Sequence, residues 1–238
     1  MIHNVPVADY SILAQTARIL LPASIGIAVI DPRVQTITAS HLKMYSLAKM
    51  VPSRQREFVA GRTAAHAAMI EIGQTPQPIP MGNDRAPIWT KGLVGSISHT
   101  AEFCIALVGL QTQFAALGVD LEPNAPLDKD LIPEILTKNE ADWLARQPLN
   151  DQPYLVRLIF SAKECAYKCQ YPLTRQIFGF DGFDIQLDQT QNHFQARFTR
   201  RVGSFVENHI LTGRFDITQN LILTTMAIHA DGTSRIKE

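Results

Sequence analysis

Cysteine is scarce in this sequence of 238 residues, which contains only Cys104, Cys165 and Cys169. An odd, low count without paired spacing does not support a disulfide framework and is typical of a reducing compartment. Cys165 and Cys169 are one helical turn apart, but no Cys-x-x-Cys motif or cysteine–histidine pairing accompanies them. Small buried thiols are therefore favoured over metal ligands.

The sequence also lacks net charge, because lysine plus arginine and aspartate plus glutamate both total 22. Nucleic-acid-binding proteins usually carry a basic excess, so no nucleic-acid partner is expected, while a local basic groove for a phosphate ligand is compatible with this balance. The apolar stretch at residues 19–30 is interrupted by proline and glycine and is too short to span a membrane. The N-terminus has no basic region followed by an apolar core, so no signal peptide is apparent and a cytoplasmic protein is expected.

What the sequence does contain is a regular alternation of apolar segments. At 46% hydrophobic and 18% charged residues, the chain is expected to bury a core as one large domain or as two domains of about 100–150 residues. Residues 75–93 are rich in proline and glycine and indicate a long surface loop. Helices are expected at residues 10–21, 54–72, 138–147 and 152–170. Strands are expected at residues 25–30, 93–98, 103–110, 114–121, 183–187, 194–198, part of 204–215, and 221–228.

Two carboxylates stand at the end of the strand expected at 114–121. Asp120 and Glu122 are two residues apart, so they face the same side of a strand while Val119 and Leu121 enter the core. Two acids held this close repel each other unless a cation lies between them, and their hard oxygens suit Mg²⁺. Alone, the pair is also explained by an exposed strand end with solvated acids, which contribute little to stability.

A second group of charged residues lies at residues 160–168. Glu164 and Lys168 are four residues apart and share one helix face, where a carboxylate suits a metal and an ammonium suits phosphate oxygens. A structural explanation also exists, since Ser161 and Glu164 match an S-x-x-E capping box and Glu164 with Lys168 matches a helix-stabilising pair.

Two further groups suit phosphate. The strand expected at 93–98 leads into Ser98, His99 and Thr100, which offer hydroxyls, amides and an imidazole. Arg54, Arg56 and Arg62 lie on the helix that follows Pro52, and Arg85 lies in the proline-rich loop; arginine can bond two phosphate oxygens at once. Each of these residues, taken singly, is also explained as a buried histidine or a solvated charge.

Together, these four segments resemble the phosphopantetheinyl transferase family, in particular its surfactin-synthetase-activating and enterobactin-synthetase component D branch. The family is marked by a Gly-Val/Ile-Asp-x-Glu segment followed by a Phe/Trp-Ser-x-Lys-Glu helix, matched here by residues 118–122 and 160–164. Residues 56–62, 84–89, 92–100 and 168–172 are similar to other segments of that branch. The resemblance covers about residues 50–172 in order, with Cys165 standing where alanine or serine is usual.

The resemblance implies a role for each of these residues. Asp120, Glu122 and Glu164 are expected to hold Mg²⁺ against the pyrophosphate of coenzyme A, with Lys168 contacting the same group and assisting the leaving 3′,5′-ADP. Asp120, Glu164 and Lys168 are thus the expected catalytic residues. The nucleotide is expected to be bound by Arg56, Arg62, Arg85, Ser98, His99, Lys163 and Lys168.

The resemblance also implies the fold and the partners. Two similar α+β halves, residues 1–112 and 113–238, are expected to be related by a pseudo-twofold axis with the ligand cleft between them. A weak similarity of residues 56–65 to residues 157–166, at an offset of 101, is consistent with such halves. The expected partners are apo carrier-protein domains of siderophore or other nonribosomal peptide synthesis, and the protein is expected to be a monomer.

Two other functions remain open on the residues alone. A different Mg²⁺-dependent transferase or hydrolase acting on a nucleotide diphosphate would use the same acids, although no G-x-x-x-x-G-K-[ST] phosphate loop and no G-x-S-x-G elbow is present. A non-catalytic binding module is the other alternative, and the acids at 120, 122 and 164 together with Lys168 argue against it.

Overall fold

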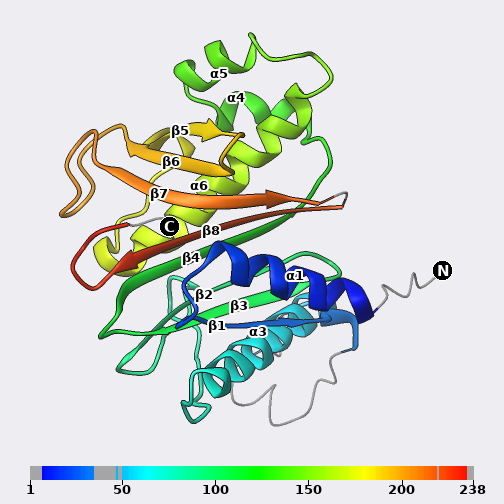
Figure 1. Cartoon of the computed structure of the whole chain (residues 1–238), viewed down its shortest axis with the longest axis vertical. Coiled ribbons are helices and arrows are strands. Elements are labelled where there is room, and N and C mark those ends of the chain that lie inside the picture. The colour runs from blue at the N-terminus through cyan, green and yellow to red at the C-terminus, as the bar shows by residue number, and fades with distance from the viewer. Residues whose placement is uncertain (1–6, 35–46, 48–49, 219, 235–238) are drawn as a thin grey trace.

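The computed structural model describes residues 7–34, 47, 50–218 and 220–234 and shows helices packed on two antiparallel sheets (Figure 1). The α+β class predicted from the sequence is confirmed. No helix among the described residues is long and apolar enough to cross a membrane. The first sheet ends at Leu110 and the second begins at Phe114. We therefore retain a boundary near residue 112 as a proposal, together with the pseudo-twofold relation of the halves.

The smaller sheet has the strand order β1-β3-β2, with β1 at Gly26–Ile30, β2 at Leu93–His99 and β3 at Cys104–Leu110. Side chains of β3 alternate, so that Ala106 and Val108 face helix α3 (Pro52–Glu71) while Ile105 and Leu107 face the other layer. Helix α3 lies so close to the sheet that a Cβ at Gly26 would stand 2.1 Å from the carbonyl oxygen of Ala68. Glycine is therefore required where α3 crosses β1.

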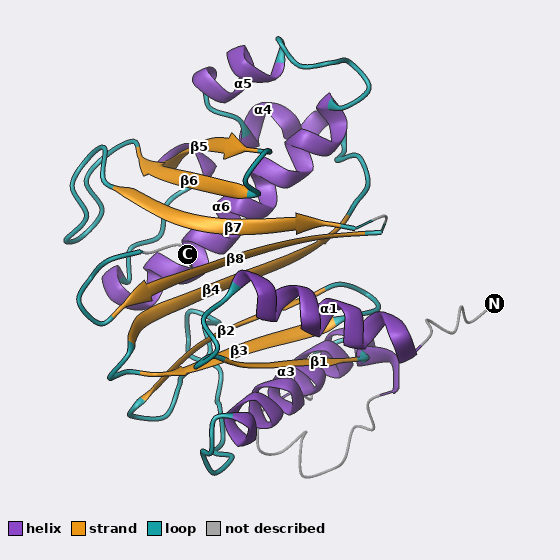
Figure 2. Cartoon of the chain, in the orientation of Figure 1, coloured by secondary structure: helices purple, strands orange, loops and turns teal. Residues whose placement is uncertain are grey.

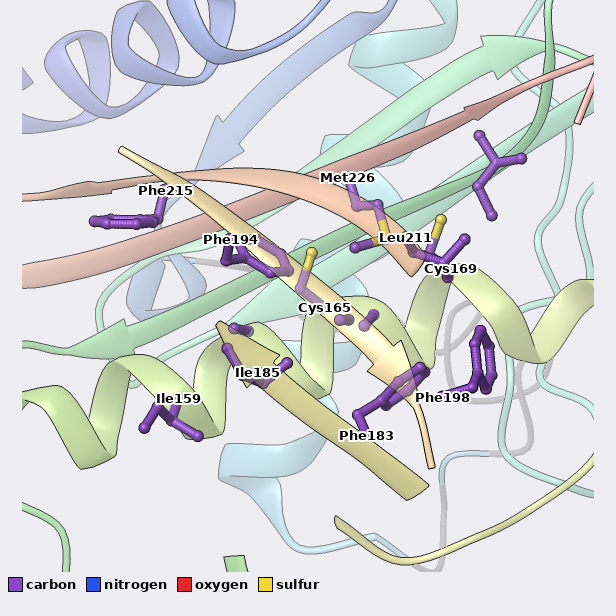
Figure 3. Close-up of a cluster of buried hydrophobic side chains, with 14 of the residues drawn as sticks. Ile159, Cys165, Cys169, Phe183, Ile185, Phe194, Phe198, Leu211, Phe215 and Met226 are labelled. Atoms are coloured by element: carbon purple, nitrogen blue, oxygen red, sulfur yellow. The ribbon is translucent and has the colours of Figure 1, made fainter. Parts of the chain in front are cut away.

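The larger sheet has the order β4-β8-β7-β6-β5 and carries helix α6 (Gln152–Thr174) on one face (Figure 2). A Cβ at Gly118 would stand 2.3 Å from the carbonyl oxygen of Cys165, so β4 and α6 also meet through a glycine. Figure 3 shows the core between α6 and the larger sheet, where Cys165 and Cys169 are buried among phenylalanines, as predicted for small buried thiols. The strands are β4 (Phe114–Pro123), β5 (Phe183–Asp188), β6 (His193–Phe198), β7 (Ile210–Ile217) and β8 (Leu221–His229).

Strands β2 and β4 lie side by side at the seam between the two sheets, but they belong to different sheets. Two serine side chains of β2 take the place of ladder bonds there. The hydroxyl oxygen of Ser96 accepts from the N–H of Val119 at 3.0 Å, and that of Ser98 accepts from the N–H of Leu121 at 3.2 Å. Helix α1 (Val7–Leu20) contacts β1 on one side of the seam and β7 and β8 on the other.

The short elements lie mainly around the first half of α6. They are the 3-10 turns at Pro32–Val34, Lys129–Leu131 and Phe180–Gly182, and the helices α4 (Ile132–Ile135) and α5 (Lys138–Leu144). Helix α5 begins with a capping box in which the side chains of Thr137 and Glu140 exchange hydrogen bonds with each other's backbone N–H.

The structure corrects one detail of the sequence interpretation. Helix α6 begins at Gln152, so Ser161 lies inside it and the S-x-x-E motif is not a capping box; the hydroxyl of Ser161 shares a hydrogen bond with Thr224 at 2.9 Å. The strand expected in part of 204–215 is confirmed and begins at Ile210. The proline-rich segment is a loop as expected, and Ile79 within it is fully buried.

Candidate active site

A cavity of about 710 Å³ lies between α3, β2, β4, α6 and the loop at residues 84–89. Its walls come from both sheets and from both long helices, and its size suits a small-molecule or cofactor site. Four of the residues expected to catalyse or to hold a metal line it together, namely Asp120, Glu122, Glu164 and Lys168.

The floor of the cavity is a hydrogen-bonded group of three side chains. Lys168 donates to Asp120 Oδ1 at 2.7 Å and to the hydroxyl oxygen of Ser98 at 3.1 Å, and that hydroxyl donates to the same Asp120 oxygen at 2.9 Å. Burial alone would lower the pKa of Lys168, but the attraction and hydrogen bond of Asp120 outweigh it and raise the pKa. Lys168 is therefore a cation at neutral pH, held at the cavity wall.

Asp120 is buried, with 4% of its side chain exposed, and its sequence-based description as a possible solvated acid is wrong. Its Oδ2 atom is buried and has no hydrogen-bond partner among the described residues. A buried carboxylate oxygen left without a donor is costly unless a ligand or ion completes it. Val119 and Leu121 enter the core on either side of it, as the alternation predicted.

The other two acids occupy different surroundings. Glu122 accepts a hydrogen bond from Arg157 at 2.8 Å, and Arg157 also donates to the carbonyls of Ala125 and Pro126. Burial raises the pKa of Glu122 and of Glu164, and the negative charge of Asp120 raises both further. Asp120 thus repels both glutamates, as expected from the sequence for Asp120 and Glu122.

The donor chemistry suits a divalent cation, but the conformation described is not a finished metal site. Among the residues that the structure describes, no three acidic, histidine or cysteine side chains are gathered closely enough to hold an ion. Asp120 fits best, because its Oδ2 atom is available, and Glu164 lines the same cavity. Glu122 lines the cavity as well, with one carboxylate oxygen paired with Arg157. Hard carboxylate oxygens supplemented by phosphate oxygens are the donor set that Mg²⁺ prefers.

One wall of the cavity is basic. Arg54 of α3 is hydrogen-bonded to His99 Nε2 and forms an ion pair with Glu57 at 3.1 Å. Burial lowers the pKa of His99, and the positive charge of Arg54 lowers it further. His99 is therefore neutral at pH 7 and accepts the Arg54 hydrogen bond at Nε2, while its Nδ1 lies 3.7 Å from a Glu57 carboxylate oxygen. Arg54, mentioned but not assigned a role from the sequence, lines the cavity.

The remaining expected nucleotide-binding residues divide into two groups. Arg62 and Arg85 line the cavity; the guanidinium of Arg62 is 4.0 Å from the centre of the Phe58 ring and donates to the carbonyl of Ile79 at 2.9 Å. Arg56 is half-buried on α3 but is not among the described residues that line the cavity. Lys163 points away from it and pairs with Glu140 at 2.7 Å, with 1% of each side chain exposed.

Comparison with known proteins identifies the family. Residues 43–109 match the 4′-phosphopantetheinyl transferase N-terminal domain, and residues 116–224 match the 4′-phosphopantetheinyl transferase superfamily. The chain belongs to the 4′-phosphopantetheinyl transferases and is therefore a transferase enzyme.

Three relatives show how far the similarity extends. The 4′-phosphopantetheinyl transferase Svp of Streptomyces mobaraensis is 34% identical over 77% of this chain and 76% of its own length. The 4′-phosphopantetheinyl transferase PptT of Mycobacterium tuberculosis is 31% identical over 76% of this chain and 82% of its own length. Enterobactin synthase component D of Salmonella typhimurium is 38% identical, over 48% of this chain and 47% of its own length.

Proposed function

We propose that this enzyme transfers the 4′-phosphopantetheine arm of coenzyme A to a serine of an apo carrier protein and releases 3′,5′-ADP. The observation that supports the proposal most directly is the lining of a single cavity by Asp120, Glu122, Glu164 and Lys168 beside a basic wall. Family membership supports the same reaction type, since the relatives are named for it.

In this proposal the basic wall binds the nucleotide end of coenzyme A. Arg54, Arg62, Arg85 and His99 line the part of the cavity nearest α3 and the 84–89 loop. Arginine forks suit phosphate oxygens, and the neutral His99 holds Arg54 by accepting its hydrogen bond. Ser98 is already engaged with Asp120, Lys168 and the N–H of Leu121, so we assign it to holding the floor as well as lining the cavity.

Lys168 performs the chemistry that the leaving group needs. The serine hydroxyl loses its proton to solvent as its oxygen bonds to the phosphorus that bears the pantetheine, and the bond from that phosphorus to the 3′,5′-ADP oxygen breaks, so negative charge grows on the departing phosphate. A cation fixed by Asp120 neutralises that charge without having to reorganise. We also assign to the Lys168 ammonium the donation of a proton to the leaving group.

We assign Asp120, Glu164 and Glu122 to Mg²⁺, which when bound neutralises charge on the pyrophosphate oxygens. The unpartnered Oδ2 of Asp120 and the repulsion of Glu122 and Glu164 by Asp120 support the assignment. Glu164 cannot serve at once as a tight ligand and an efficient base, and we assign it to the cation. Magnesium-induced changes in the backbone amide NMR signals of residues 120, 122 and 164 would test this without measuring transfer.

The carrier is proposed to be a peptidyl, aryl or acyl carrier domain of siderophore or other nonribosomal peptide synthesis. The similarity to enterobactin synthase component D supports the siderophore pathway, although that similarity covers half of the chain. The cytoplasmic location and the monomeric state expected from the sequence stay predictions. A panel of apo carriers from the source organism would identify the carrier.

Intact-protein mass spectrometry of an apo carrier incubated with enzyme, coenzyme A and Mg²⁺ tests the function. A gain of one phosphopantetheine arm, abolished by chelation and by Glu164→Gln, is the expected result. Release of 3′,5′-ADP without a modified carrier would instead establish a hydrolase. Binding of coenzyme A with no reaction would establish the non-catalytic module.

A further inference from the structure

The proline-rich loop and the C-terminal end of α6 are joined at the edge of the cavity. The phenol of Tyr171 donates to Asp84 Oδ2 at 2.7 Å, and Arg175 donates to the same oxygen at 3.3 Å. All three residues line the cavity, and the first pair lies 87 positions apart in the sequence. We call this group, Asp84 with Tyr171 and Arg175, the clasp.

The other oxygen of Asp84 shapes the loop itself. Asp84 Oδ1 accepts from the N–H of Ala86 at 3.1 Å, and the turn is closed by the N–H of Arg85 on the carbonyl of Gly82 at 2.9 Å. Arg85, between these contacts, has a φ of 65°. A residue with a side chain rarely adopts this left-handed conformation, so it persists only where the surrounding contacts hold it.

We propose that Asp84 is a positioning residue for coenzyme A, which holds Arg85 against the cavity and is itself held by Tyr171 and Arg175 of α6. The inference rests on the proposed function, in which coenzyme A occupies this cavity. One carboxylate thus links the strained arginine turn to the helix that carries Glu164 and Lys168. Arg85 is then set in place for a phosphate before the substrate arrives.

Charge gives the clasp a second effect. A carboxylate at the rim of a phosphate-binding cavity repels the ligand unless a hydrogen-bond donor or a cation offsets the negative charge of the carboxylate. The pKa of Asp84 lies below its ordinary value, chiefly because the Tyr171 phenol donates to it, so Asp84 stays ionised at neutral pH. Tyr171 and Arg175 donate to Asp84 from α6 and so offset the negative charge that the phosphates would meet.

The two arms of the clasp differ in strength. The side chain of Arg175 is 62% exposed, and exposed ion pairs contribute little. The Tyr171 hydrogen bond is short and has a charged acceptor, so it is the stronger arm. Tyr171→Phe removes that bond alone and keeps the ring, which stacks on Tyr167 at 5.7 Å between centres.

The test is a double-mutant cycle on coenzyme A affinity, measured by titration calorimetry on the full chain. Tyr171→Phe is expected to weaken binding by about threefold to tenfold, the effect of one ordinary intramolecular hydrogen bond. In the Arg85→Ala background the same change is expected to weaken binding by less than about twofold, because the residue that the clasp positions is gone. Arg175→Ala is expected to have a smaller effect than Tyr171→Phe in the native background. Tyr154→Phe, at an exposed tyrosine of the same helix, is the matched control and is expected to leave affinity unchanged.

Each other outcome is decisive. Equal losses from Tyr171→Phe in both backgrounds would show that Tyr171 does not act through Arg85, and the inference would be wrong. Unchanged affinity in Tyr171→Phe or in Arg85→Ala would overturn it as well. If the native chain binds no coenzyme A, the proposed function fails first, which separates the two failures.

Discussion

Two lysines on helix α6, five residues apart, form ion pairs in different surroundings: one pair is fully buried and the other lies at the cavity. Lys163 is fully buried and donates to Glu140 and to the carbonyls of Ile135 and Phe180. Lys168 is partly exposed at the cavity wall and donates to Asp120 and Ser98. The first lysine binds the short elements around α6 together, whereas the second faces the space where a substrate fits.

Their acidic partners differ in the same way. Glu140 uses both oxygens, accepting from the N–H of Ile185 at 2.6 Å, from the N–H of Thr137 at 2.7 Å and from Lys163. Asp120 leaves Oδ2 without a partner among the described residues. A fully satisfied polar network contributes to architecture, while an incomplete one beside a cavity indicates a ligand site. Four predictions test this comparison.

The largest expected effect comes from breaking the satisfied pair. Lys163→Met should lower the free energy of unfolding by about 3–5 kcal/mol, because it leaves Glu140 buried without its counter-charge. Urea denaturation measures the loss. The double variant Lys163→Met with Glu140→Leu should recover part of the stability, while the folded fraction of each variant should still bind coenzyme A. If Lys163→Met had the same free energy of unfolding as the native protein, the buried pair would not stabilise the fold, and the proposed difference between the two pairs would be wrong.

Breaking the incomplete pair should affect turnover instead. Asp120→Asn should lower kcat by about 10²–10³-fold, since it removes the charge that fixes Lys168 and completes the metal site. Asn keeps the shape and an acceptor, so the melting temperature should change little. Asp120→Ala is a poorer probe than Asp120→Asn, because the acid is buried and its loss leaves Lys168 and Ser98 without their acceptor. Turnover near the native rate in Asp120→Asn would contradict the site assignment.

Lys168 itself should act on the chemical step. Lys168→Met keeps the apolar stem and should lower kcat by about 10²-fold at saturating coenzyme A, the smaller end of what a positioned proton donor contributes. Steady-state kinetics with the carrier as acceptor separates the alternatives. A rise in KM with unchanged kcat would make Lys168 a binding residue only.

The smallest effect concerns His99 on the basic wall. The pKa of His99 is lowered in the folded protein by burial and by Arg54. Below about pH 6.5 the imidazole is therefore protonated in the unfolded chain while it is still neutral in the folded chain. Stability should therefore fall as the pH drops below that value. An NMR titration of the imidazole should give a midpoint below the ordinary one, and Arg54→Ala should raise it. A midpoint at or above the ordinary value would show that the histidine is not held as described.

Patterns within a segment were predictable, and partners from distant segments were not. The alternation around Asp120 placed Val119 and Leu121 in the core because strand geometry alone decides it. The capping box at Ser161 failed because the helix expected at 152–170 does begin at Gln152, which places Ser161 in the helix interior rather than at its start. Lys163 resembled a ligand-binding charge, since nothing near it in the sequence shows that Glu140, on a separate helix, neutralises it. The same holds for Arg157 beside Glu122.

The seam between the sheets has a consequence for how substrates enter. Ser98 joins β2 to β4 with the same hydroxyl that supports Asp120 and Lys168. Separation of the two sheets at that seam would move the Ser98 hydroxyl away from Asp120 and Lys168. The bonds of Ser96 and Ser98 to β4 hold the β2–β4 side of the cavity together, and we expect ligands to enter instead at the edge formed by the 84–89 loop.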